Sequence, residues 1–132
     1  MESHKLGLKI AADDLKSAKI LLKEDLTMTA VLHTQQCFKK ALKAYLAFQK
    51  HPLDRTHDLI ILIKLCSNHD REFEVFLDFA KMLKPYATKG RYADDYIELE
   101  AGLVIDFIKK AAKVLAFVTK KIENPDPNLK LF

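Results

Sequence analysis

The stretch Gln35-Gln36-Cys37-Phe38-Lys39-Lys40-Ala41-Leu42-Lys43-Ala44-Tyr45-Leu46 decides the fold that we expect for this chain. Its apolar residues recur at steps of three and four, which is the spacing of one buried face of a helix. A second stripe of the same helix carries polar and basic residues, namely His33, Gln36, Lys40, Lys43 and Lys50. Three lysines on one stripe suit either a solvated face or a surface that binds anions, and spacing alone leaves both interpretations open.

Working outward from this helix, the composition favours a single helical domain. The chain has 132 residues, of which 49% are hydrophobic, and this is enough for one core. Only three glycines and four prolines occur, which disfavours a turn-rich all-β fold. We expect one domain over residues 1–123 and a C-terminal tail over 124–132, because Pro125 and Pro127 follow the last helical pattern.

Hydrophobic periodicity predicts an all-α fold with about five helices. They are expected at about residues 6–25, 28–50, 56–67, 70–84 and 96–123. Short connections between long helices favour antiparallel neighbours, so we predict an antiparallel up-and-down bundle.

Helix starts are predicted from residues that can cap a helix. Thr27 or Thr29 is expected to cap the second helix, Thr56 the third and Asp70 the fourth. Asp95 and Glu98 have the spacing of a capping box at the start of the last helix.

Apolar residues in excess of one small core suggest self-association. The segment 59–66 is apolar on nearly every side, and Phe107 and Phe117 add bulk outside the main stripe of the last helix. We therefore expect a homodimer that buries a helical face.

Charge and cysteine content limit the classes of function. The formal net charge is +4 and the isoelectric point is about 9.0, which permits phosphate or RNA binding without requiring it. Cys37 and Cys66 lie on predicted apolar faces and suggest a reducing compartment. The five histidines show no zinc spacing, so we expect no metal and no cofactor. No signal peptide or membrane span is visible, and we expect a cytoplasmic protein.

Three segments in order carry a resemblance to a known family. They are 35–46 as quoted above, Thr56-His57-Asp58-Leu59, and Tyr86 followed by Arg91-Tyr92-Ala93-Asp94. With these segments and its helical pattern, the chain resembles the HEPN domain family over roughly residues 8–120. The resemblance implies a bundle of about five helices, usually dimeric. It also implies a substrate- or nucleotide-binding companion of a minimal nucleotidyltransferase, whereas other members of the family are ribonuclease toxins.

The chain departs from the family pattern at two positions and lacks one signature. Lys39 stands where an acidic residue is frequent, and Ala93 stands where a proline is frequent. The nuclease branch of the family carries an arginine followed four to six residues later by a histidine. None of Arg55, Arg71 and Arg91 has a histidine at that distance, which argues against the toxin interpretation.

Five residues are candidates for binding phosphate: Lys40, Lys43, His57, Arg91 and Tyr92. His57 is either a first-turn residue that packs at a helix start or an imidazole that donates to a phosphate there. Arg91 can bind a phosphate with two parallel hydrogen bonds and Tyr92 can stack on a base, but both can equally be structural. Tyr86 is expected to pack. Lys40 and Lys43 would form a cationic groove only if they converge with Arg91.

Paired acidic residues do not predict a metal site in this chain. Asp13 and Asp14 are adjacent, so they point to different sides of a helix, and we expect them on a solvated face. No Ser-His-Asp or Cys-His arrangement and no glycine-rich phosphate loop is visible, so enzymatic activity is left open but is not favoured, and no catalytic residue is assigned.

The sequence therefore favours a non-catalytic module that binds a nucleotide or the substrate of a partner nucleotidyltransferase through a basic groove. Two alternatives remain. The first is an RNA-cleaving toxin without the usual arginine and histidine, which would use groups such as His57 with Arg55. The second is a structural interaction protein whose apolar faces recruit a partner chain.

Overall fold

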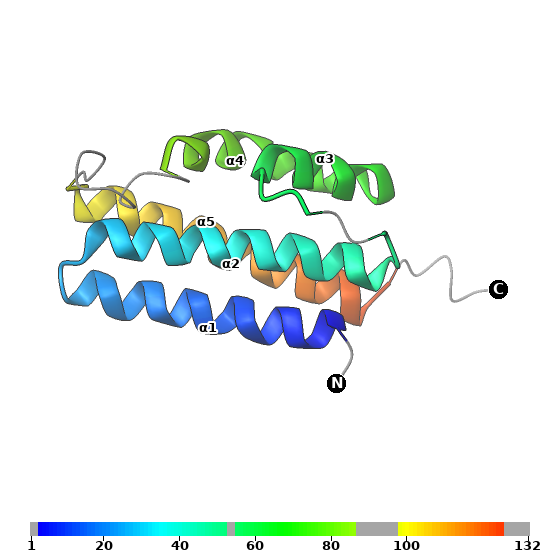
Figure 1. Ribbon diagram of the computed structural model, residues 1–132, viewed down its shortest axis with the longest axis horizontal. Helices are drawn as coiled ribbons and strands as arrows, with labels where there is room; N and C mark the ends of the chain where they lie inside the picture. The colour runs from blue at the N-terminus through cyan, green and yellow to red at the C-terminus, as the bar shows by residue number, and fades with distance from the viewer. Residues whose placement is uncertain (1–2, 53–54, 87–97, 126–132) are drawn as a thin grey trace.

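The computed structural model describes residues 3–52, 55–86 and 98–125, and the regular secondary structure in these residues consists of helices. Three long helices lie side by side: α1 (Ser3–Lys23), α2 (Thr27–Phe48) and α5 (Ala101–Glu123). Two shorter helices, α3 (Leu59–His69) and α4 (Leu77–Leu83), form a hairpin over α2, as Figure 1 shows. The 3₁₀ helix η1 (Arg71–Phe76) joins α3 to α4, and a second one, η2 (Lys84–Tyr86), follows α4. The predicted all-α bundle is confirmed.

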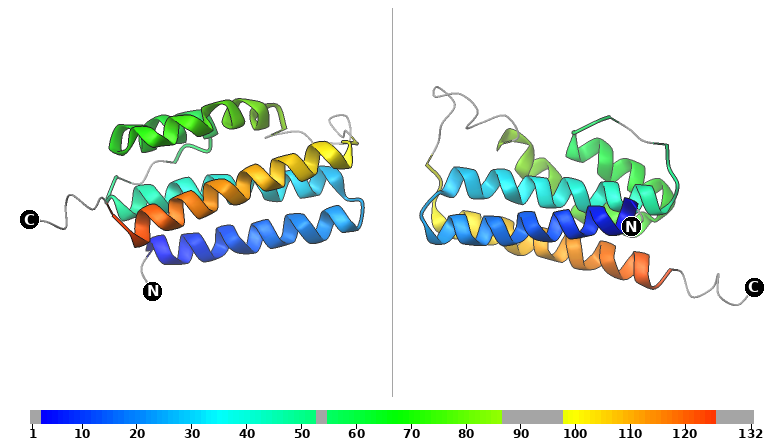
Figure 2. Two further views of the ribbon diagram at one scale, coloured as in Figure 1. Left: turned by 180° about the vertical axis from the view of Figure 1, so that it is seen from behind. Right: turned by 60° about the horizontal axis from the view of Figure 1, so that its bottom comes forward.

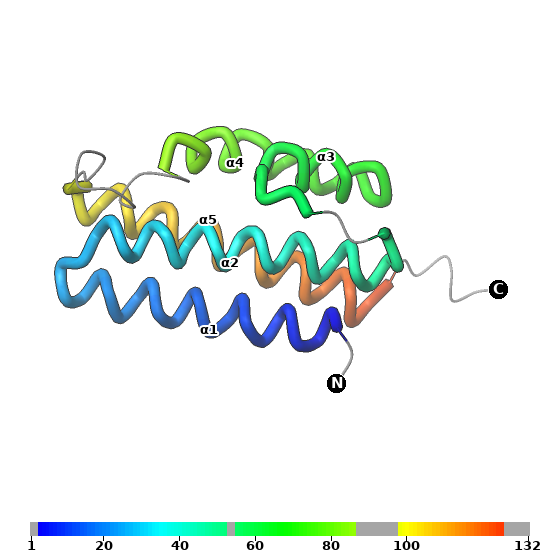
Figure 3. The backbone as a smooth tube through the Cα atoms, viewed as in Figure 1, coloured from blue at the N-terminus to red at the C-terminus, as the bar shows by residue number. Residues whose placement is uncertain are grey.

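The directions of the helices follow from their connections. α1 and α2 are antiparallel because a tight turn joins them, whereas α5 runs the same way as α2. Figure 2 shows the same helices from behind. α3 runs the same way as α2, and α4 then carries the chain back toward the end of the bundle where α5 begins. The tube in Figure 3 follows this path through the hairpin.

Both long N-terminal helices end in the same local motif. After α1, the backbone N–H of Leu26 donates to Leu21 O (2.9 Å), and Asp25 has a positive φ of 60°. After α2, the N–H of His51 donates to Leu46 O (2.9 Å), and Lys50 has a φ of 57°. These are Schellman-type ends, which glycine usually occupies at the left-handed position. The chain uses aspartate and lysine there and bears a local strain at each turn.

The helix starts differ from the prediction in three places. Asp58, not Thr56, caps α3, because its carboxylate accepts hydrogen bonds from the N–H groups of Ile60 and Ile61. Thr27 is the first residue of α2, and its hydroxyl instead accepts a hydrogen bond from the N–H of Leu99 (3.2 Å).

The last helix also starts later than predicted. α5 begins at Ala101, so Glu98 precedes it and forms no capping box there, while Asp95 lies outside the described residues. The predicted cap Asp70 is confirmed for the helical turn that begins at Arg71, since it accepts from the N–H of Glu72 (3.0 Å).

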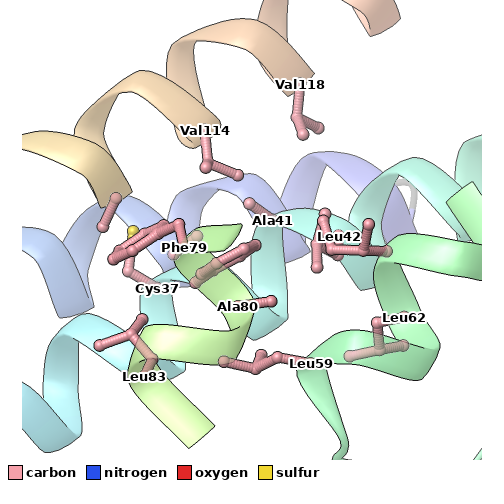
Figure 4. Close-up of a cluster of buried hydrophobic side chains, with 14 of the residues drawn as sticks. Cys37, Ala41, Leu42, Leu59, Leu62, Phe79, Ala80, Leu83, Val114 and Val118 are labelled. Atoms are coloured by element: carbon pink, nitrogen blue, oxygen red, sulfur yellow. The ribbon is translucent and has the colours of Figure 1, made fainter. Parts of the chain in front are cut away.

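The core is built on both sides of α2. Figure 4 shows Cys37, Ala41 and Leu42 of α2 between Val114 and Val118 of α5 and the apolar side chains of the hairpin, among them Leu59, Leu62, Phe79, Ala80 and Leu83. Phe38 stacks on Phe79 with ring centroids 4.9 Å apart. The deciding stretch 35–46 is therefore the spine of the bundle, as its apolar spacing predicts.

Two phenylalanines that were expected to lie outside a single core belong to this core. Phe107 is 1% exposed, and Phe117 packs edge-on against Phe73 and Phe76, with ring centroids 5.0 Å apart in each pair. The prediction that these rings exceed one core was wrong, because α4 and η1 cover them. The third helix is also less completely buried than predicted, since Ile61 is 45% exposed.

Candidate functional site

Lys40 and Lys43 lie one turn apart on α2 but face different neighbours. Lys40 Nζ donates to Asp14 Oδ2 of α1 at 2.7 Å. His33 Nδ1 lies 3.0 Å from the other oxygen of the same carboxylate. The basic stripe is therefore divided: its His33 and Lys40 part is tied to α1, and only its continuation toward Lys43 faces the hairpin.

The burial of Asp14 contradicts a prediction made from the sequence. It was expected on a solvated face, yet it is 8% exposed and carries the two contacts just described, while its neighbour Asp13 is exposed and pairs with Lys9. A carboxylate in a poorly solvated position needs charged or hydrogen-bonding partners, and Lys40 and His33 supply them. Much of the charge of Lys40 is thus neutralised within the bundle.

Lys43 meets His57 across the gap between α2 and the start of α3. Lys43 Nζ lies 3.5 Å from His57 Nδ1, which joins two of the predicted site residues that are distant in sequence. Lys84, at the end of the hairpin, lies nearby, with its Nζ 3.6 Å from Asp58 Oδ2. We call Lys43, His57 and Lys84, which lie near the start of α3, the α3 basic cluster.

The α3 basic cluster lies at a helix start that is already capped by the carboxylate of Asp58. Burial raises the pKa of Asp58, but hydrogen bonds from the N–H groups of Ile61 and Ile60 and the nearby Lys84 outweigh it, so that the pKa is lowered. Because Asp58 satisfies these donors, a phosphate here would be bound by the side chains of the cluster rather than by the helix N-terminus.

The hairpin is held over α2 by a polar contact in the core. The amide Nε2 of Gln35, which is 7% exposed, donates to the carbonyl of Leu83 at 2.7 Å. This bond fixes the end of α4 on α2 and thereby sets where Lys84 begins the next turn. Lys84 was not among the predicted site residues, because the contact that places it joins segments far apart in sequence.

Arg91 and Tyr92 lie outside the described residues, so the structure places neither of them beside Lys43. Tyr86, just before that gap, contacts the ring of Phe107 with centroids 5.8 Å apart, in keeping with its predicted packing role. The convergence of Lys40 and Lys43 with Arg91 therefore stays a prediction.

A cleft of about 560 Å³ lies at the opposite end of the hairpin, where α2, α3 and α5 all end. Tyr45, His69, Arg71 and Lys121 are among its lining residues. Lys121 Nζ contacts Asp70 at 2.8 Å and Glu72 at 3.0 Å. This cleft is absent from the sequence-based candidates, because its walls come from the ends of three helices.

Metal ligands, thiols and helix lengths in the described part of the chain bear on the kind of site that it offers. There, no group of three or more His, Cys, Asp or Glu side chains is arranged to hold a metal ion. Cys37 and Cys66 are fully buried, and burial raises the pKa of each thiol to about 12. None of the helices in these residues has the length and apolar character needed to cross a membrane.

Comparisons with known proteins agree with the fold. The HEPN domain model matches residues 5–122. A curated relative from Methanocaldococcus jannaschii, named "Putative toxin MJ1304", is 50% identical over 98 residues, which are 70% of this chain and 64% of that protein. The crystal structure of ST0689, described as an archaeal HEPN homologue, is similar with a TM-score of 0.73 and 26% identity, over 92% of this chain and 99% of that one.

Proposed function

The chain belongs to the HEPN domain family, and on this basis we propose that it is a non-catalytic module that binds the phosphates of a nucleotide or of RNA at the α3 basic cluster. The observation that carries the proposal is the approach of Lys43 Nζ to within 3.5 Å of His57 Nδ1. An ammonium beside an imidazole gives a phosphate two donors from two different elements.

The predicted site residues have different roles in this proposal. Lys43 and His57 are retained, and Lys84 joins them because it lies at the same helix start. Lys40 is assigned a structural role, since Asp14 already holds its ammonium at 2.7 Å. Arg91 and Tyr92 are kept as candidates for a bidentate phosphate contact and for stacking on a base.

The biological setting that we propose is a companion of a minimal nucleotidyltransferase, acting as a homodimer. In that setting the module would hold a nucleotide or a substrate while the partner performs the transfer. A dimer has apolar surface available, since Val75, Met82 and Ile105 are 72%, 41% and 42% exposed.

Titration with ATP and with a short RNA oligonucleotide tests the binding site. We expect saturable binding that Lys43→Ala weakens about tenfold, a loss of ~1.4 kcal/mol, because one charge-assisted contact is removed. Lys109→Ala is the matched control, because Lys109 is an exposed lysine of α5. The proposal fails if the wild-type protein binds neither ligand at millimolar concentration, or if the two variants weaken binding equally.

A second candidate function is that of a toxin, and the name of the M. jannaschii relative favours it. The chain spans 64% of the length of that relative, so the activity of the whole relative is carried over only as a proposal. Growth arrest on expression that His57→Ala abolishes would support a toxin using this imidazole. Unimpaired growth, together with nucleotide binding, would favour the companion role.

A further inference from the structure

His69 lines the cleft where α2, α3 and α5 end, and its ring meets that of His51. His51 Nδ1 lies 3.2 Å from His69 Nε2, and the planes of the two rings are 83° apart. Neither residue belongs to the α3 basic cluster. We call them the His51–His69 pair.

Both histidines lie at helix ends, His51 just after α2 and His69 at the end of α3. His51 follows the left-handed Lys50, and its N–H donates to Leu46 O at 2.9 Å. His69 is the last residue of α3, and its ring contacts Tyr45 edge-on, with centroids 6.4 Å apart. His69 is exposed and His51 is partly exposed, so an ion from solvent reaches the pair without any rearrangement of the core.

The distance between the two ring nitrogens suits a shared metal ion. Two imidazole nitrogens that bind one tetrahedral Zn²⁺ at about 2.0–2.1 Å are about 3.3 Å apart along the edge of the tetrahedron. The observed separation of 3.2 Å is close to this value. An N–H···N hydrogen bond spans a similar distance, so the separation fits either a hydrogen bond or a shared metal ion.

The helix ends around the cleft favour a bound cation. The charged residues that line it are balanced, with Arg71 and Lys121 opposite Asp70 and Glu72. Three helices end around it, at Phe48, His69 and Glu123. The C-terminal end of a helix carries partial negative charge and favours cations. α1 begins at the same end of the bundle, but none of its residues lines the cleft.

Among the described residues that line the cleft, both carboxylates are engaged, whereas His69 and the neighbouring His51 offer imidazole nitrogens. Lys121 Nζ contacts both Asp70 and Glu72 within 3.0 Å. Neutral imidazole is a ligand that Zn²⁺, Cu²⁺ and Ni²⁺ accept readily. A site with two protein ligands keeps open positions for water or for a donor atom of a molecule in the cleft.

We propose that the His51–His69 pair binds one Zn²⁺ ion at the rim of this cleft, with its remaining positions open to water or to a cleft ligand. The site is separate from the α3 basic cluster and does not depend on phosphate binding there. Binding uses the lone pairs of His51 Nδ1 and His69 Nε2, so each ring carries its proton on its other nitrogen.

Zn²⁺ titration of tag-free protein, followed by competition with a chromophoric chelator, tests the site. We expect one Zn²⁺ per chain, with affinity at least tenfold weaker in His51→Ala and in His69→Ala. His57→Ala is the matched control and keeps the wild-type affinity, which also separates this site from the phosphate site. Equal Zn²⁺ affinity in the wild type and in the double variant, as expected for adventitious metal only, overturns the proposal.

A second measurement does not depend on any substitution. In the ¹⁵N spectrum of the histidine rings, Zn²⁺ is expected to shift the signals of His51 and His69 and to leave those of His57 in place. Unchanged signals for the pair would mean that the two rings share only an N–H···N hydrogen bond, and the metal site would be rejected.

Discussion

Single residues of one type have different roles in this bundle, depending on which element covers them. Asp13 and Asp14 are adjacent, yet one is exposed and the other lies between α1 and α2 with Lys40 and His33. Lys40 and Lys43 divide in the same way, since the first is held by α1 and the second faces His57. Residue type therefore indicates what a side chain can do, and the neighbouring helix decides what it does.

Replacement of Asp14 is the first test at this scale. We expect Asp14→Ala to lower the free energy of unfolding by about 1–2 kcal/mol, between the small value of an exposed ion pair and the larger one of a fully buried pair. Lys40 loses its carboxylate partner in that variant, and part of its charge stays poorly solvated. Urea unfolding followed by circular dichroism measures the difference.

Asp13→Ala is the matched control for this substitution. Its side chain is 67% exposed in an i, i+4 pair with Lys9, so we expect a loss below about 0.5 kcal/mol. Equal losses in the two variants would contradict the structural role assigned to Asp14.

For the helices, the sequence predicts their presence better than it predicts the residues at which they begin. All five predicted helices are present, because their apolar stripes reflect burial that any helical packing must satisfy. The start of α3 was displaced because Thr56 and Asp58 can both cap a helix, and local sequence does not show which one does. The start of α5 was displaced to Ala101, which Glu100 precedes without a side-chain cap. The site is less predictable still, since the contacts of Asp14 and Lys84 depend on tertiary packing.

The contact between α1 and α2 depends on a small residue. A Cβ atom added at Gly7 would lie 3.2 Å from the Cβ of Ala44, whereas one added at Gly102 in α5 meets nothing within 4 Å. The absence of a side chain at Gly7 therefore allows the two helices to approach closely, and Gly102 has no such role in packing.

Substitutions at the two glycines test this difference. We expect Gly7→Leu to lower the free energy of unfolding by about 2 kcal/mol, because the larger side chain forces α1 away from α2. Gly102→Ala is expected to raise it by roughly 0.5 kcal/mol through better helix propensity. Thermal unfolding of both variants checks the signs, and a stabilised Gly7→Leu would contradict the close packing.

At the scale of the whole molecule, the end of the bundle near Lys121 is held by charge as well as by packing. Lys121 lies over the ring of Phe117, 5.3 Å from its centroid, and joins α5 to Asp70 and Glu72. Burial raises the pKa of Asp70, but hydrogen bonds from Lys121 and from the N–H of Glu72 outweigh it and lower the pKa below its ordinary value. The pKa of Lys121 is raised, chiefly by its hydrogen bond to Asp70.

Stability should therefore fall in acid in a way that depends on Lys121. A carboxyl with a lowered folded-state pKa stabilises the protein above its unfolded pKa of about 3.9, and this contribution is lost as the pH falls through the folded-state value. We expect Lys121→Met to unfold more easily at pH 7, by about 1 kcal/mol, and to lose less stability than the wild type between about pH 5 and pH 2. Parallel acid-unfolding curves for the two proteins would contradict this coupling.

The two buried thiols have a consequence for the chemical surroundings that the protein tolerates. Burial raises the pKa values of Cys37 and Cys66 to about 12, so very little thiolate is present at either position at pH 7. Oxidants and alkylating agents attack the thiolate, and both sulfurs are fully buried. The fold is thus expected to be indifferent to the redox potential around it, and its cysteines act as small apolar side chains of the core.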